Sequence, residues 1–394
     1  MEENITDRIS ELPGFIIHHI LSYLDSPKEL VRMSVLSNYW FELTASFPIL
    51  DFDFLKFEKV IESSGILIDT EKDKRNMFFK YVEYTVSRFC EQNVSVHTFK
   101  LVTFFPDPSD VEIIDRCLGL ILEKGVKVLV IDVPQHRQMY RVPNILLSAY
   151  SLTSMKLRKC ELPSSLMVDV VRFKSLKVLH LDAVPLNEEM IKRLTTSCPF
   201  LEELAVDHCY GLKRFCVHRH LNLQQVEVSF GREFESIDIE APNLYYLSLY
   251  DCDKRGSPPS MNLTSCKKLT KLCYRGKGLT DFSSNFPFLE DLFLELPNRC
   301  KRLTLSSHSL RTILLRSKCD LGKIDIDAPN LLLFGFTDYS HFYFRKEMIS
   351  VPSKACMEWD CDDFIKGHWF QKLRQFLDKK IRFRDLKLRI SCET

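Results

Sequence analysis

The residue types best suited to metal chemistry lie in the stretch "HCYGLKRFCVHRH", residues 208–220, which holds three histidines and two cysteines. Imidazoles and thiolates are the ligands that zinc prefers in proteins. The repeat period described below, however, places His208 just past an inner strand and Cys216 on an outer strand, on opposite sides of a solenoid wall. The chain also contains no C-x-x-C pair. We therefore expect no metal site and no cofactor.

Motifs for catalysis are absent as well. The sequence contains no G-x-S-x-G, H-E-x-x-H or G-x-x-x-x-G-K-S/T motif. The stretch "RGKGLTD", residues 275–281, has two glycines but lacks the third glycine and the strand-to-helix context of a phosphate-binding loop. The acidic run "EWDCDDF", residues 358–364, is typical of a solvated loop. No side chain can be nominated for catalysis, so we expect that the chain is not an enzyme.

The charge balance gives no hint of a polyanionic partner. The sequence has 54 Lys plus Arg against 53 Asp plus Glu, a formal net charge of +1. No long-range field therefore attracts nucleic acid or a lipid surface. The basic stretch "KKIRFRDLKLR", residues 379–389, alternates with apolar positions as a strand would. We expect neither nucleic acid nor a membrane as a partner.

The cysteines and the N-terminus indicate a reducing compartment. Fourteen cysteines are scattered at irregular spacing, and the opening Met-Glu-Glu-Asn is not followed by the apolar region of a signal peptide. Reduced thiols at core positions are therefore expected in place of disulfides. The expected location is the cytoplasm, the nucleus or both.

A repeat defines the architecture that would position any binding residues. Apolar residues at positions 1, 4 and 6 recur in copies that begin at 152, 176, 201, 223, 244, 269, 289, 310 and 331. Successive starts are thus 24, 25, 22, 21, 25, 20, 21 and 21 residues apart. This is the leucine-rich-repeat period, in which each copy supplies one strand to a parallel sheet. Fainter copies begin at 96, 126 and 383.

The segments that return between inner strands are of two kinds. Apolar residues at helical spacing predict helices within 107–124 and 187–198. Strict alternation predicts short outer strands at 212–217, 234–239, 300–305 and 321–326. The predicted fold class is α/β: a small helical N-terminal segment followed by a curved leucine-rich-repeat solenoid with a parallel inner sheet and a mixed helix and strand outer side.

Residues 10–40 carry more apolar surface than they can bury among themselves. Ile16, Ile20 and Leu24 lie on one helical stripe, which ends at Pro27, and a second stripe begins at Leu30. Two or three helices in about 40 residues fall below the size at which a core sustains itself. Part of this surface therefore needs another molecule. The alternative is a simple cap on the solenoid, but a cap needs one apolar face and this segment offers more.

These residues resemble a known module. "DRISELPGFIIHHILSYLDSPKELVRMSVLSNYW" followed by "PILDFD" resembles the N-terminal F-box of the plant F-box/leucine-rich-repeat (FBD-like) family, and with the irregular repeats the resemblance covers nearly the whole chain. It implies that the F-box docks on a Skp-type adaptor, and through it on a cullin. The repeats would hold an unknown target protein for ubiquitination. Residues 368–390 resemble the final helix and strand of such proteins, although the family's "FDV" ending is not evident.

The resemblance also implies which residues meet the adaptor. Those expected to face it are Leu12, Pro13, Ile16, Ile20, Leu21 and Leu24, and those expected to be shared between adaptor and core are Val31, Val35, Leu36 and Trp40. One feature departs from the family pattern. Asn38 and Tyr39 stand where members usually carry a basic pair, so a favourable charge contact to an acidic adaptor would be missing.

The target would bind on the concave face of the repeats, where positions 3, 5 and 7 of each inner strand point away from the core. In the section from 244 to 316 the candidate residues are Tyr246, Tyr250, Lys271, Arg275, Phe293, Leu314 and Arg316. Aromatic and arginine side chains are typical of binding hot spots. Exposed aromatics that only shield neighbouring strands are an equally good interpretation.

The sequence thus predicts four parts: an F-box at 5–50, a linker with an amphipathic helix at 51–93, leucine-rich repeats at 94–345, and a C-terminal region with a capping helix and strand at 346–394. The expected function is that of the substrate-recognition subunit of an SCF-type ubiquitin ligase, which acts by proximity and not by bond chemistry. The alternative is a repeat scaffold or inhibitor that never joins a ligase.

Overall fold

The chain divides into two compact units, Met1–Pro185 and Leu186–Thr394. The computed structural model describes residues 9, 12–21, 33, 35–45, 48–63, 70–91, 96–104, 106–133, 139–252, 259–276, 286–295, 303–316, 324–337, 354–360 and 385–391. The division falls inside the region predicted to be repeats. The bounds of the four predicted parts stay predictions, and the two units are described separately.

The first unit begins with helices. Helices α1 (Gly14–Leu21) and α3 (Asn38–Ala45) pack against each other. Ser37 precedes α3 and caps it, because its Oγ accepts a hydrogen bond from the Trp40 backbone N–H at 3.2 Å. Helices α4 (Phe54–Ser63) and α5 (Glu71–Glu91) follow. Helix α5 contains the amphipathic helix expected near 76–90, and its buried Phe78, Val82 and Val86 lie on one stripe at helical spacing.

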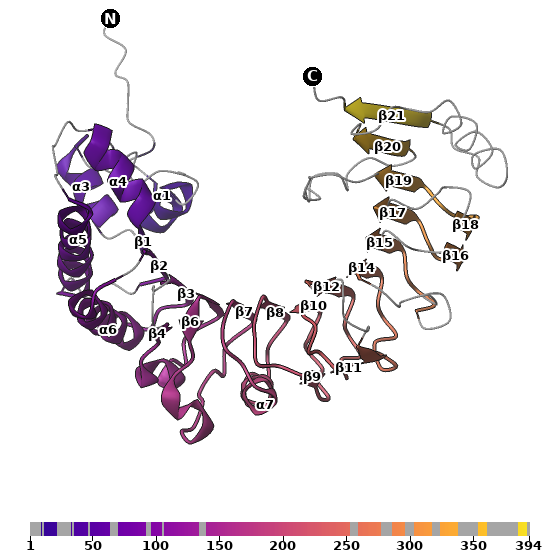
Figure 1. The fold of residues 1–394 in the computed structure, drawn as a ribbon. Helices are drawn as coiled ribbons and strands as arrows, with labels where there is room; N and C mark the ends of the chain where they lie inside the picture. The colour runs from indigo at the N-terminus through magenta and orange to yellow at the C-terminus, as the bar shows by residue number, and fades with distance from the viewer. Residues whose placement is uncertain are drawn as a thin grey trace, which may run out of the picture. The chain divides into compact units, whose positions relative to one another are not determined.

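Five inner strands form the parallel sheet of the first unit (Figure 1). In order they are β1 (Ile49–Asp53), β2 (Thr98–Val102), β3 (Val128–Asp132), β5 (Ser154–Arg158) and β7 (Val178–Asp182). The return segments are α6 (Pro108–Glu123), η1 (Asn144–Ser148), η2 (Ser164–Met167) and the short strands β4 (Tyr140–Arg141) and β6 (Cys160–Glu161). Arg75 fastens α5 to the start of α6, since it contacts Asp107 and its Nε lies 3.0 Å from Asp110 Oδ2.

In the described part of the second unit, nine inner strands form the main sheet. In order they are β8 (Glu203–Asp207), β10 (Gln225–Phe230), β12 (Tyr246–Asp251), β14 (Lys271–Arg275), β15 (Asp291–Glu295), β17 (Thr312–Arg316), β19 (Leu333–Thr337), β20 (Lys354–Asp360) and β21 (Asp385–Ser391). Its returns are α7 (Glu188–Ser197), the outer sheet of β9 (Arg214–Val217), β11 (Ser236–Ile239) and β13 (Ser260–Asn262), and the outer pair β16 (Leu303–Ser306) and β18 (Ile324–Asp327). Figure 1 shows α7, β9 and β11 on the outer side of the main sheet, below β8, β10 and β12 in the view.

Alternation along an inner strand such as β12 separates core from surface. There Leu247 and Leu249 are buried, whereas Tyr246 and Ser248, the residues that precede them, stay partly exposed. Burial of a leucine contributes about 1.5–3 kcal/mol. A single repeat has nothing to cover its ends, so this burial requires neighbouring repeats on both sides.

The predicted fold class is confirmed. The nine clear repeats supply β5, β7, β8, β10, β12, β14, β15, β17 and β19, and the fainter copies supply β2, β3 and β21. The predicted helical returns are α6 and α7, and the predicted outer strands are β9, β11, β16 and β18. Two further inner strands, β1 and β20, were not predicted from the repeat pattern. The expected final helix lies outside the described residues.

Gly211 gives a test of the turn that follows β8. Its φ is +92°, and a Cβ there would lie 2.7 Å from the backbone oxygen of Leu186. We predict that Gly211→Ala lowers the free energy of unfolding by about 1–3 kcal/mol, because the left-handed backbone and the clash both penalise a side chain. Urea unfolding of the full chain followed by circular dichroism measures this.

Gly231→Ala is the matched control. Its φ is not positive, and an added Cβ would meet nothing within 4 Å. The change should therefore stay within about 0.5 kcal/mol. Equal losses for the two variants would mean that the turn at Gly211 is not formed as described.

Candidate functional site

The helical segment of the first unit buries part of its apolar surface in a core of its own. That core consists of Ile17, Leu21, Trp40 and Leu43, with the partly buried Leu12, Met33 and Ile49 packed against it. Two sequence-predicted adaptor contacts are therefore internal. Leu21, expected to face the adaptor, is 2% exposed, and Trp40, expected to be shared, is 4% exposed. Both face inward because α1 and α3 meet along this stripe.

Other apolar side chains of the same segment stay open. Val35 is 79% exposed and Leu36 is 62% exposed, just before α3, while Ile20 and Tyr39 are also exposed. Pro13 is exposed at the start of α1, and Ile16 is partly buried. We call Pro13, Ile20, Val35, Leu36 and Tyr39 the helical apolar surface. Leu24 and Val31 lie outside the described residues.

The face of the main sheet in the second unit carries the residues predicted to bind a target. Tyr246, Tyr250, Lys271, Arg275 and Phe293 are partly exposed on it, in line with the alternation of the strands. Leu314 and Arg316 are only 4% and 8% exposed. The prediction that these two line an open face is wrong, because strict alternation ends in β17, where four successive residues are buried.

One row of this face is joined by electrostatic contacts. Strand register places Tyr250 beside Arg275, Arg275 beside Glu295, and Glu295 beside Arg316. The Arg275 guanidinium lies 4.5 Å from the centroid of the Tyr250 ring. Glu295 Oε2 lies 2.6 Å from Arg275 Nε and 3.7 Å from Arg316 Nη1. Two arginines thus share one buried carboxylate.

A second row begins with Tyr246. Burial raises the pKa of its phenol, and the nearby Glu227 raises it further, so the hydroxyl stays protonated and can donate a hydrogen bond. Lys271 beside it pairs with Asp291 at 3.4 Å, in a solvated setting. The polar groups of this row are either neutral, as in Tyr246, or paired with an opposite charge, as in Lys271. Covering them with a partner costs little desolvation free energy, which suits a protein-binding face.

The histidine and cysteine cluster does not converge. Strand β8 ends at Asp207 just before His208, whereas Cys216 lies in β9 of the outer sheet. His208 instead meets Tyr250, with ring centroids 6.5 Å apart. Within the described ranges no group of three or more His, Cys, Asp or Glu residues is placed to hold a metal ion. Over the same ranges, no helix has the length and apolar character to cross a bilayer.

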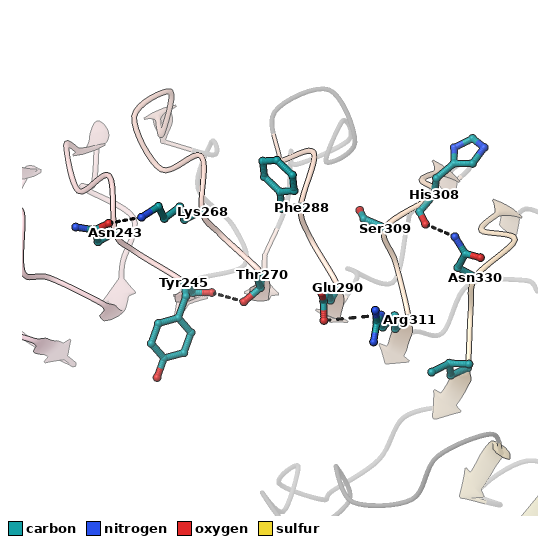
Figure 2. A pocket seen from close by; sticks show the side chains of 11 residues that line it. Asn243, Tyr245, Lys268, Thr270, Phe288, Glu290, His308, Ser309, Arg311 and Asn330 are labelled. Carbon is teal, nitrogen blue, oxygen red and sulfur yellow. Dashed lines mark hydrogen bonds and ion pairs between the residues drawn. The ribbon is translucent and has the colours of Figure 1, made fainter.

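A groove that sequence reasoning missed lies along the rim of the main sheet, where the chain enters successive inner strands (Figure 2). It encloses about 890 Å³. One row of its lining precedes the first leucine of each repeat and the other follows it. The lining residues are Asn243, Tyr245, Lys268, Thr270, Phe288, Glu290, His308, Ser309, Arg311, Asn330 and Leu332. We call this the rim groove.

The sequence contains a pattern from which the rim groove could have been predicted. Every repeat places a residue on either side of its first leucine, outside positions 3, 5 and 7, and these flanking residues reach the rim. The motif "PFLE" at 287 puts an exposed Phe288 there, as the similar "PFLE" at 199 does for Phe200. Exposed aromatics at a fixed repeat position are a pattern that could have been searched for.

Comparison with known proteins agrees with this architecture. A family model described as the At1g61320/AtMIF1 LRR domain matches residues 90–255. F-box/LRR-repeat protein 25 of Arabidopsis thaliana is 25% identical over 252 residues, which cover 63% of this chain and 87% of that protein. An FBD-associated F-box protein of the same plant is 26% identical over 356 residues, covering 87% and 76%.

A further F-box/LRR-repeat protein of Arabidopsis thaliana is 28% identical over 330 residues, which cover 80% of this chain and 81% of that protein. The family model covers inner strands from β2 to β12. Over most of its length this chain is therefore similar to plant proteins named as F-box/LRR-repeat or FBD-associated F-box proteins.

Proposed function

We propose that this protein is the substrate-recognition subunit of an SCF-type ubiquitin ligase. The observation that carries the proposal is the helical apolar surface, on a segment whose small core already contains Trp40 and Leu21. The names of the relatives support it, since two combine F-box and LRR and the third is an FBD-associated F-box protein. The proposed partner is a Skp-type adaptor, and through it a cullin, in the cytoplasm or nucleus.

Energetics favour a partner over solvent at this surface. Covering a side chain such as Leu36 contributes about 1.5–3 kcal/mol, and Val35 and Ile20 would add to it. Tyr39 brings an aromatic ring with a polar tip, a residue type enriched in binding hot spots. These apolar contacts would support docking. Asn38 and Tyr39 stand in place of a basic pair, and the loss of that pair would mainly lower the association rate.

The mechanism would be one of position. The repeats hold a target while the adaptor places the complex beside a ubiquitin-charged enzyme, which raises the effective concentration of the reacting groups. No side chain of this chain need take part in bond making. The family relationship supports a non-catalytic role.

The alternative is a repeat scaffold or inhibitor outside any ligase. Asn38 and Tyr39 favour it, since the missing basic pair removes a charge contact to an acidic adaptor. Adaptor binding therefore separates the two functions.

We predict that Leu36→Glu weakens binding to a purified plant Skp-type adaptor by at least about tenfold in affinity. A charge at the centre of an apolar interface must be desolvated without a partner. Titration calorimetry on the full chain measures the affinity, and circular dichroism checks that the exposed substitution leaves the fold intact.

Val168→Glu is the matched control. Val168 lies in the same unit and is 82% exposed, but it follows η2 and is far along the chain from the helices. It should bind the adaptor as the unaltered protein does. The receptor function is refuted if the unaltered protein fails to bind, or if the Leu36 and Val168 variants bind equally well.

The proposed target face contains both available and structural residues. Lys271 has a side chain that is 45% exposed and only a solvated ion pair to hold it, so it can turn to a ligand. Glu295 and Arg316 are nearly buried and hold the sheet together. A target would therefore contact Tyr246, Lys271 and Arg275, and the Glu295 pairings would fix Arg275 in place.

We predict that Glu295→Gln lowers the free energy of unfolding by about 2–4 kcal/mol, because it removes the countercharge of the nearly buried Arg316. Asp291→Asn, in the same strand, removes the countercharge of the solvated Lys271 and should cost less than about 1 kcal/mol. Urea unfolding of both variants makes the comparison. Similar costs would contradict the division into structural and available residues.

A further inference from the structure

Apolar side chains recur in the rim groove at every second strand. The order of neighbouring strands is β12, β14, β15, β17 and β19. Tyr245 stands before β12, Phe288 before β15 and Leu332 before β19. The strands between them, β14 and β17, contribute polar or basic residues instead, among them Lys268 and Arg311. Figure 2 shows Tyr245 and Phe288 directed to opposite sides of the groove.

This spacing matches an extended polypeptide. Neighbouring strands lie about 4.8 Å apart, so every second strand is about 9.6 Å away. An extended chain rises about 3.1–3.4 Å per residue, whether polyproline II or β, so three residues span about 9.3–10.2 Å. A helix rises about 1.5 Å per residue, would need between six and seven residues for each step, and returns its side chain to nearly the same direction after seven. Residues three apart on a β-extended chain instead point to opposite sides, as Tyr245 and Phe288 do (Figure 2).

The charge of the groove lining indicates which residues a ligand would carry between its apolar ones. The groove lining contains two basic residues, Lys268 and Arg311, and one carboxylate, Glu290. Its formal charge is therefore +1 when histidine is counted as neutral. Glu290 lies 3.9 Å from Arg311 Nε, and both side chains are well exposed, so this pair is weak. Lys268 Nζ donates to Asn243 Oδ1 at 2.8 Å, a neutral acceptor that leaves its charge uncompensated. Acidic side chains on a ligand would complement this lining.

The floor of the groove is rigid. Tyr245 O accepts a hydrogen bond from Thr270 N at 3.0 Å, and Thr270 O accepts one from Glu290 N at 2.8 Å. Glu290 O and Arg311 O continue the ladder to the next two strands, at 2.8 and 2.7 Å. The residues on this row are therefore fixed by backbone pairing before any ligand arrives, which reduces the entropic cost of binding.

We propose that the rim groove binds an extended segment of a target protein that carries an apolar residue at every third position and acidic residues between them. The segment would lie across the strands, with its apolar side chains at Tyr245, Phe288 and Leu332. This deepens the proposed function by naming the target chemistry, and it concerns only the second unit, so it can fail or hold independently of adaptor binding.

The test uses fluorescence anisotropy with the full chain and a labelled nonapeptide that repeats leucine, glutamate and serine three times. Two probes are compared with it: one has the same composition with its leucines at every second position, and one has lysine in place of glutamate. We expect saturable binding of the first probe and at least about fivefold weaker binding of the other two. Absence of saturable binding, or equal affinity for the first two probes, overturns the proposal.

Phe288→Ala supplies the site-specific arm. Removal of a 61% exposed ring should leave the fold intact and weaken the first probe about tenfold, as loss of a hot-spot aromatic does. Phe200→Ala is the matched control, because Phe200 holds the same place in its own "PFLE" motif, is 55% exposed, and does not line the groove. Equal effects of the two substitutions would place the peptide elsewhere and refute the groove as its site. Adaptor affinity, measured in parallel, should be the same for both variants.

Discussion

Burial of the leucines in each inner strand depends on the strands beside it, and the rest of the structure follows from this constraint. A strand such as β12 covers Leu247 and Leu249 only when β10 and β14 pair with it in parallel. Parallel pairing in a fixed register stacks equivalent positions of successive repeats into rows. The row of Tyr250, Arg275 and Glu295 and the floor of the rim groove are two such rows. Binding surfaces thus arise as a by-product of core packing.

The same constraint separates the repeats from the N-terminal helices. Repeats supply one another with apolar neighbours, whereas the helical segment has only a few residues with which to cover Trp40 and Leu21. It completes a small core and leaves Val35 and Leu36 in solvent. A cluster of exposed apolar side chains of this kind is typical of a site for another subunit. The proposed receptor function assigns adaptor binding to this surface and target binding to the repeats.

Sequence periodicity predicted most of the inner strands and the kind of return segment, because both depend on local patterns of apolar residues. It missed β1, although Phe47, Leu50 and Phe52 fit the apolar spacing there with phenylalanine at two of the three positions. It also missed β20, whose sequence "KACMEWD" does not fit the spacing and joins the sheet through pairing with a neighbour. Repeat positions placed Leu314 and Arg316 on an open face, and the family resemblance placed Leu21 at the adaptor surface. Each of these is buried by packing that no local pattern records. The rim groove was missed because only strand positions were considered as binding positions.

The most direct measurement of the central claim is hydrogen–deuterium exchange of the full chain with and without a purified plant Skp-type adaptor. The account predicts slower exchange at residues 12–21 and 35–45 on addition of the adaptor, where backbone amides lie beneath the helical apolar surface. The inner strands of the second unit should not change. Unaltered exchange in the helical segment, or protection confined to the repeats, would contradict the account.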